Sequence, residues 1–267
     1  MVFYSQSAPS HIHTQESVQS LYWKTLAALG PALAAAAFFH GGDALRIMGL
    51  SLLGGGAAYA LAGRIFDRKI EFPEPSLFLS CLLFALNMSP AASWQSVLAG
   101  SAFGIFFGRE IFGGLAGSIF HPALAGNVFA GLAFSQALPA DGVLAGGFAG
   151  AVCLFAGGIA LVWNRLISLE IAALYLVFTF LLHFPGTDSI SRAATGPVFL
   201  TAFFFVSDPV TTPLSRSGQR LFACGAALLG FIVKAPANPG VVLLMNGLSG
   251  WLDTWTKKRS GLCREPP

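Results

Sequence analysis

FALNMSP at residues 84–90 closes one short apolar run of the sequence, and FFVSDPV at residues 204–210 closes another. Two further apolar runs begin at a proline, within HPALAGNVFAG at 121–131 and within NPGVVLLMNGLSG at 238–250. Proline suits the first turn of a helix and disfavours helix in the residue before it. The first two runs are therefore predicted to stop inside the protein, and the other two to restart there.

The composition around these interruptions is that of a membrane protein. Of the 267 residues, 55% are hydrophobic and only 10% are charged, and the mean hydropathy is +0.69. Soluble domains carry about 25% charged residues, and a helix that crosses a bilayer needs about 20 apolar residues. We therefore expect an integral membrane protein in contact with the lipid bilayer. The net charge of +3 is spread over many loops and gives no reason to expect a nucleic acid partner.

The hydropathy pattern predicts an all-α polytopic fold with about ten transmembrane helices. The apolar segments are 21–40, 43–63, 76–90, 93–112, 122–138, 142–164, 166–184, 195–207, 219–235 and 239–255. With the N-terminus in the cytoplasm, ten crossings put 12 Lys and Arg residues on the inner side and 3 on the outer side. This bias follows the positive-inside rule and predicts that both termini are cytoplasmic, in a bacterial inner membrane.

The spacing of the interruptions predicts an internal repeat. Pro90 and Pro209 are 119 residues apart, and Pro122 and Pro239 are 117 apart. Five crossings turn the second copy over, so the repeats would be inverted, as in transporters whose ligand site lies where broken helices meet. The expected parts are a polar tail at 1–20, a first repeat at 21–140, a second at 141–256 and a basic tail at 257–267.

Asp208 is the sharpest polar feature of the apolar sequence. It follows the run VFLTAFFFVS and precedes Pro209. An acid at a membrane helix end is costly unless it is hydrogen-bonded or functional. Asp208 therefore either ties its loop to a neighbouring helix end or belongs to a binding site, together with Ser207, Thr211 and Thr212.

FGREIFGGLAGSIFHPA at residues 107–123 is the second polar region. Gly113 and Gly114 permit close approach of the backbone to a ligand or to another helix, and Arg109 with Glu110 predicts an ion pair at the cytoplasmic edge. His121 lies at a helix start, where free N–H groups accept an anion or a ring carbonyl, although a lone His more often has a structural role.

Four amides lie at the broken-helix positions, namely Asn87, Asn127, Asn238 and Asn246. They either satisfy freed backbone groups, which irregular structure in lipid requires, or hold the edge of a flavin or quinone. The sequence holds no nucleotide-binding fingerprint and no Cys or His spacing of a metal site. We expect no metal and no catalytic side chain.

The motifs FGREIFGGLAGSIFHPALAGNVF, SDPVTTPLSRSGQRLF and PGVVLLMNGLSGWLD resemble, in this order, those of the RnfD/NqrB family. Members of this family are the flavin-carrying membrane subunits of the Rnf complex and of sodium-pumping NADH:quinone reductase. The resemblance implies a ten-helix fold similar to urea transporters. It also implies electron transport through flavin, coupled to sodium or proton movement, with other redox subunits as partners.

The flavin attachment of the family has no counterpart here. Family members usually attach FMN through a Thr in an S-x-A-T motif, in an outer segment between the fifth and sixth helices. The corresponding connection here, SQALPADG at 135–142, holds no Thr, and Ala194-Thr195 belongs to the start of the eighth helix. His121 also stands where the family commonly has Asn. We therefore expect a shortened relative with no covalent FMN.

The cofactor expected from the resemblance is a noncovalent flavin (FMN or riboflavin) or a quinone. Its predicted site residues are Gly113, Gly114, His121, Asn127, Ser207, Asp208, Thr211 and Thr212. The leading hypothesis is a cofactor-carrying subunit of a flavin- or quinone-linked electron-transport complex. The alternatives are a channel or transporter for a small solute or ion, and a membrane anchor for a redox partner.

Overall fold

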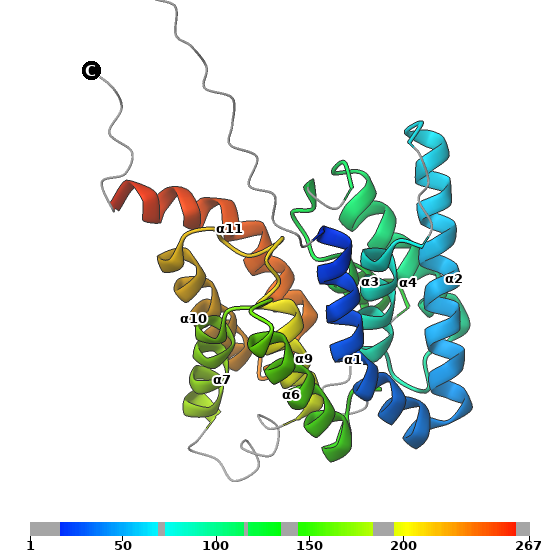
Figure 1. The fold of residues 1–267 in the computed structure, drawn as a ribbon, viewed down its shortest axis with the longest axis horizontal. Helices are drawn as coiled ribbons and strands as arrows, with labels where there is room; N and C mark the ends of the chain where they lie inside the picture. The colour runs from blue at the N-terminus through cyan, green and yellow to red at the C-terminus, as the bar shows by residue number, and fades with distance from the viewer. Residues whose placement is uncertain (1–16, 69–72, 115–116, 135–143, 184–194, 260–267) are drawn as a thin grey trace, which may run out of the picture.

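The computed structural model describes residues 17–68, 73–114, 117–134, 144–183 and 195–259, and these residues form helices and connecting turns (Figure 1). The first five helices are α1 (Val18–His40), α2 (Gly42–Ile65), α3 (Pro75–Leu86), α4 (Trp94–Ile105) and α5 (Pro122–Ala133). The next five are α6 (Gly147–Trp163), α7 (Leu169–His183), α9 (Gly196–Leu200), α10 (Arg216–Ile232) and α11 (Pro239–Arg259). The π-helical turns η1 (Phe106–Glu110) and η3 (Thr201–Phe205) extend α4 and α9.

Each of the ten predicted apolar segments overlaps one of these ten described helices, which confirms the all-helical prediction. Some boundaries differ. The helix α1 begins at Val18, inside the predicted polar tail, because Ser17 caps its first turn by accepting a hydrogen bond from the Ser20 N–H at 3.2 Å. The helix α6 begins at Gly147 rather than 142, and α10 begins at Arg216 rather than 219.

The helix starts follow local chemistry. Pro75, Pro122 and Pro239 each occupy the first position of a helix, where the missing N–H costs nothing and the fixed φ angle suits the helix. Ser93 and Ser215 cap α4 and α10 through their side-chain oxygens. The helices that begin at Pro122 and Pro239 are the two that the sequence predicts to restart inside the protein.

The broken end of α3 is paired with a distant segment. After Leu86 the chain turns at Asn87, and the carbonyls of Leu86 and Met88 accept hydrogen bonds from the N–H groups of Ala145 and Leu144 at 2.9 and 3.0 Å. Unpaired backbone groups are costly in lipid, so this pairing stabilises the break. It also explains why α6 starts later in the chain than predicted, because the N–H groups of residues 144–145 are hydrogen-bonded to the end of α3.

The helices of the first and second halves lie on opposite sides of the bundle, and α1 meets α6 between them (Figure 1). Within the first half α2 packs on α4, α4 on α5, and α1 on α3. Within the second half α7 packs on α10, α10 on α11, and α6 on α9. Three helix pairings of the first half thus have counterparts in the second half, five helices later in the chain.

Close helix packing depends on glycine at several crossings. A Cβ on Gly104 of α4 would lie 2.4 Å from the carbonyl oxygen of Pro122, and a Cβ on Gly126 of α5 would lie 2.5 Å from that of Gly100. A Cβ on Gly157 of α6 would lie 2.3 Å from the carbonyl oxygen of Ala28 on α1. Small residues at these positions let the helix backbones touch, as is common in membrane helix pairs.

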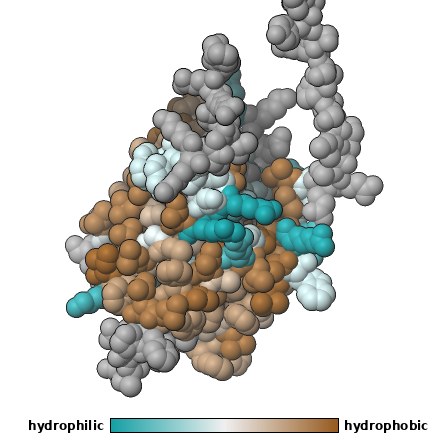
Figure 2. Space-filling view, turned by 90° about the vertical axis from the view of Figure 1, so that its left-hand side faces the viewer, coloured by the Kyte–Doolittle hydropathy of each residue, from teal (hydrophilic) through white to brown (hydrophobic). Residues whose placement is uncertain are grey.

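The surface of the bundle is largely apolar. Figure 2 shows one face that is mostly hydrophobic, with a few hydrophilic side chains gathered in one region. Phe38, Phe148 and Trp163 are each more than four-fifths exposed. By length and composition α1 and α2 can each cross a bilayer, and five shorter apolar helices accompany them. Such a surface on an all-helical bundle fits a lipid environment.

The Gly104 crossing gives a stability prediction. Changing Gly104→Ala places a methyl group against backbone, which must move, so we expect a loss of about 1–3 kcal/mol and a lower unfolding temperature in detergent. Gly56→Ala is the matched control, because nothing lies within 4 Å of its added Cβ on α2. Its unfolding temperature should be equal to wild type or higher, and a similar loss in both variants would contradict the packing argument.

Candidate functional site

The first and second halves enclose a cavity of about 210 Å³, here called the interface cavity. Its first-half wall comes from α1, α3 and the start of α5, and its second-half wall from α6, η3 and the loop after η3. Three predicted site residues, His121, Asp208 and Thr211, line it together. Residues separated by almost 90 positions in the sequence thus meet where two broken helices come together.

Asp208 organises the turn that follows η3. Its Oδ2 accepts hydrogen bonds from the N–H and the hydroxyl of Thr211, at 3.2 and 2.8 Å. Its carbonyl accepts from the Thr212 hydroxyl at 2.7 Å. Asp208 is therefore a structural acid, but it stabilises its own turn rather than tying the loop to a neighbouring helix end. It also lines the interface cavity, and its part in a binding site stays a prediction.

His121 is buried at the start of α5 and borders the interface cavity. Its ring meets that of Phe205 edge-on, with centroids 4.9 Å apart. Its Nδ1 has no hydrogen-bond partner among the described residues. With the Asn246 amide oriented to satisfy both of its ends, the amide oxygen accepts from the His121 backbone N–H at 3.2 Å. The His121 backbone N–H is thus hydrogen-bonded to α11, whereas the ring Nδ1 can still bond to another group.

A second cavity, of about 270 Å³, lies at the ends of α2, α3 and η1 and is here called the ion-pair cavity. Gly113 and Gly114 line it, with φ angles of 101° and 93° that other residues rarely adopt. The structure therefore separates the predicted site residues, because these two glycines border a different cavity from His121 and Asp208.

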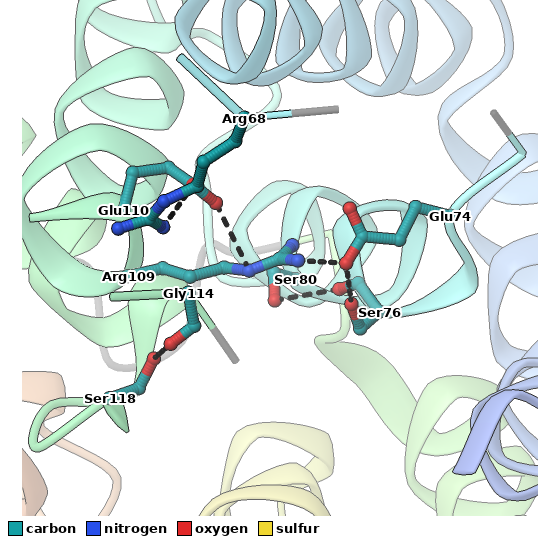
Figure 3. Close-up of polar contacts among 8 residues, drawn as sticks. All are labelled: Arg68, Glu74, Ser76, Ser80, Arg109, Glu110, Gly114 and Ser118. Atoms are coloured by element: carbon teal, nitrogen blue, oxygen red, sulfur yellow. Dashed lines mark hydrogen bonds and ion pairs between the residues drawn. The ribbon is translucent and has the colours of Figure 1, made fainter. Parts of the chain in front are cut away.

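Four charged side chains form a chain along the ion-pair cavity (Figure 3). Arg109 is bonded to Glu74, its Nε lies 3.3 Å from Glu110, and Glu110 in turn lies 3.6 Å from Arg68. Arg109 and Glu110 are each only 3% exposed. The predicted Arg109–Glu110 pair is thus confirmed, and the structure adds Glu74 and Arg68 as partners.

The ion-pair chain leaves polar atoms without protein partners. Among the described residues, Nη1 of Arg109 and Oε2 of Glu74 have no hydrogen-bond partner. Buried charges are costly unless they are paired and hydrogen-bonded. Water or a ligand in the ion-pair cavity would therefore stabilise these two atoms by hydrogen bonding to them.

The remaining predicted site residues lie outside both cavities. The Ser207 hydroxyl donates to the Ala202 carbonyl at 2.7 Å, and the Thr212 hydroxyl donates to the Asp208 carbonyl. Asn127 is fully buried within α5, and neither end of its amide has a partner among the described residues. The connection predicted to lack the flavin Thr, 135–142, falls outside the described residues.

Several polar lining residues were not predicted from the sequence, among them Tyr22, Glu74, Ser80 and Ser118. Glu74 had a signal, because it directly precedes a proline that starts an apolar helix, as Asp208 directly precedes Pro209. Tyr22 and Ser80 are single polar residues within apolar helices, and nothing local marks them.

Comparison with known proteins matches the NQR2, RnfD, RnfE family at residues 5–146 and 141–261. The chain belongs to this family. The match confirms the resemblance carried by the three motifs. The D subunit of the ion-translocating oxidoreductase complex of Methanosarcina acetivorans is 28% identical over 242 residues, covering 84% of each chain. The D subunit of the Na⁺-translocating ferredoxin:NAD⁺ oxidoreductase complex of Acetobacterium woodii is 27% identical over 300 residues, covering 95% of this chain and 93% of the relative.

A third relative differs in the ion that its name specifies. The D subunit of the proton-translocating ferredoxin:NAD⁺ oxidoreductase complex of Clostridium ljungdahlii is 25% identical over 315 residues, covering 96% of this chain and 95% of the relative. Both this alignment and the Acetobacterium alignment are longer than the 267 residues of this chain. These family members therefore carry residues that have no counterpart here.

The ion-pair chain gives a second stability prediction. Arg109→Ala removes the partner of Glu74 and of the buried Glu110, and leaving a buried charge without its partner costs about 3–5 kcal/mol. Arg220→Ala is the control, since it breaks an exposed pair with Glu170 at 2.6 Å, for which we expect about 0–1 kcal/mol. Thermal unfolding in detergent measures the stability of both variants. Comparable losses would show that the buried ion pairs contribute no more to stability than the exposed pair.

Proposed function

We propose that this chain is the D-type membrane subunit of an Rnf-like, ion-translocating electron-transport complex. The observation that carries the proposal is the family match, which runs from residue 5 to residue 261 with a short overlap. Relatives named as the D subunits of such complexes cover most of the chain. No side chain of the protein carries electrons between redox partners by itself, so electron transport requires a bound cofactor.

The interface cavity is the proposed site of that cofactor, which is a flavin or a quinone held without a covalent bond. The donors and acceptors of the cavity suit the edge of a carbonyl-bearing ring: the open Nδ1 of His121, the carboxylate of Asp208 and the hydroxyl of Thr211. Phe203 and Phe204 add apolar wall for the ring face. When bound, the ring would supply the electron-carrying chemistry, while these residues orient it and exclude bulk water.

We also propose that the two halves are inverted five-helix repeats of the urea-transporter kind. The contacts of α2, α4 and α5 are matched by those of α7, α10 and α11, which supports the repeat. The start of α1 and the end of α11 lie toward the same end of the bundle, which supports two termini on one side of the membrane (Figure 1). The positive-inside bias assigns that side to the cytoplasm.

The cofactor proposal is tested first by colour. We expect the purified, detergent-solubilised protein to show flavin absorbance that moves into the supernatant after acid precipitation, because no covalent attachment is proposed. Colour that stays in the pellet would contradict noncovalent binding. A colourless, folded protein would reject the flavin and leave the quinone to be sought by solvent extraction.

The Asp208→Asn variant, measured in the same way, tests whether the cofactor binds in the interface cavity. Asn keeps the size of the side chain and an oxygen that can accept from Thr211, so the turn persists while the charge is lost. We expect the bound cofactor per protein to fall severalfold. The control, Asp43→Asn, removes an exposed acid that lies 3.5 Å from Arg46, and it should retain the wild-type content. Equal losses would place the cofactor elsewhere.

Topology is tested with reporters. A reporter fused after Pro267 should be cytoplasmic, and one inserted near Asp141 should be external, because an even number of crossings separates the two termini and an odd number separates each from the middle connection. Alkaline phosphatase and green fluorescent protein fusions report the two sides. Any other pattern would reject ten crossings.

A further inference from the structure

The interface cavity and the ion-pair cavity share one wall. Tyr22 and Val18 of α1 line both cavities. These two residues are four positions apart, so they lie on the same face of the helix. The half-buried Tyr22 ring thus stands between the ion-pair chain on one side and the proposed cofactor site on the other.

Three serines, drawn in Figure 3, lie along the two cavities near Tyr22. On α3, Ser76 lines the ion-pair cavity and Ser80 lines the interface cavity, and the Ser80 hydroxyl donates to the Ser76 carbonyl at 2.9 Å. The Ser76 hydroxyl donates to Glu74 at 2.9 Å. After η1, Gly114 lines the ion-pair cavity and Ser118 the interface cavity, with the Ser118 hydroxyl 3.2 Å from the Gly114 carbonyl.

Polar atoms without a partner among the described residues lie on both sides of the partition. They are Nη1 of Arg109 in the ion-pair cavity and Nδ1 of His121 at the interface cavity, and both side chains are more than nine-tenths buried. Buried water satisfies such atoms where the space is polar and large enough. Each cavity therefore has both the volume and the open hydrogen-bonding capacity to hold water.

We propose that Tyr22 gates a proton route from the ion-pair cavity to the interface cavity. The proposal rests on the proposed function, because a flavin or quinone ring that takes two electrons from a redox partner protein also takes up two protons. With the Tyr22 ring in place the partition is closed. When the ring turns away, water joins the two cavities, and protons pass along that water and the hydroxyls of Ser76, Ser80 and Ser118.

The charged and titratable groups along this route are few. Glu74, Arg109 and Glu110 face its inner end, with Arg68 at the rim. His121 and Asp208 face its other end.

Cysteine labelling tests the gate without any bound cofactor. In full-length protein whose four cysteines have been replaced by alanine, Ser80→Cys places a thiol in the interface cavity. Inside-out vesicles expose the inner side to a small cationic methanethiosulfonate reagent. We expect slow labelling with the native Tyr22, labelling about tenfold faster or more with Tyr22→Ala, and no change with Tyr22→Phe, which keeps the ring.

Two controls define the result. Ser76→Cys in the ion-pair cavity should label at the same rate in all three Tyr22 backgrounds, and Tyr59→Ala, which lines only the ion-pair cavity, should leave the Ser80→Cys rate unchanged. Fast labelling with the native Tyr22, or no acceleration by Tyr22→Ala and Tyr22→Ser in folded protein, overturns the gate. Because labelling needs no cofactor, a colourless protein with the full Tyr22 effect would reject the cofactor proposal alone.

Discussion

No water pairs with backbone groups in the core of a bilayer, so every interruption of a helix there needs a partner from the protein itself. This chain interrupts its helices and supplies the partners from distant segments. The N–H groups of residues 144–145 donate to carbonyls at the end of α3, and the Asn246 side chain of α11 accepts from the backbone N–H at the start of α5. The Tyr175 hydroxyl donates to the Pro236 carbonyl at 2.5 Å. Each such bond joins elements far apart in the sequence, so the broken helices hold the bundle together.

The same interruptions create the two cavities. Where η3 ends at the Asp208 turn and α5 starts after His121, two helix ends face each other and leave the interface cavity between them. Where η1 ends, the wide π-helical turn presents Arg109 toward Glu74, and Glu110 toward Arg109 and Arg68. A π-helical turn within an α-helix is often found at functional sites. The interface cavity and the ion-pair cavity each border one, which links the irregular backbone to the proposed chemistry.

The fold was largely predictable from the sequence, and the site only partly. Hydrophobic length and the prolines at 122 and 239 predict the helices, because both act locally along the chain. Asp208 and His121 stand out as polar residues beside prolines at helix ends. Tyr22 and Ser80 do not, since a single hydroxyl in an apolar helix is normal and becomes informative only when another helix brings a cavity to it. The division of the predicted residues between two cavities likewise depends on how α3 and η1 pack, which no local pattern encodes.

A contribution to stability alone does not explain why the chain contains the buried ion-pair chain. Replacing buried ion pairs by apolar residues is often neutral or stabilising, so a membrane protein that buries Arg109 and Glu110 bears a cost. The cofactor proposed for the interface cavity would have matching needs, namely polar groups and water close to its ring and a partition that separates the two cavities between turnovers. The complexes of the Acetobacterium and Clostridium relatives are named for different ions, sodium in one and protons in the other. A proton route to the cofactor serves either kind of complex, because ring reduction takes up protons whichever ion the whole assembly translocates.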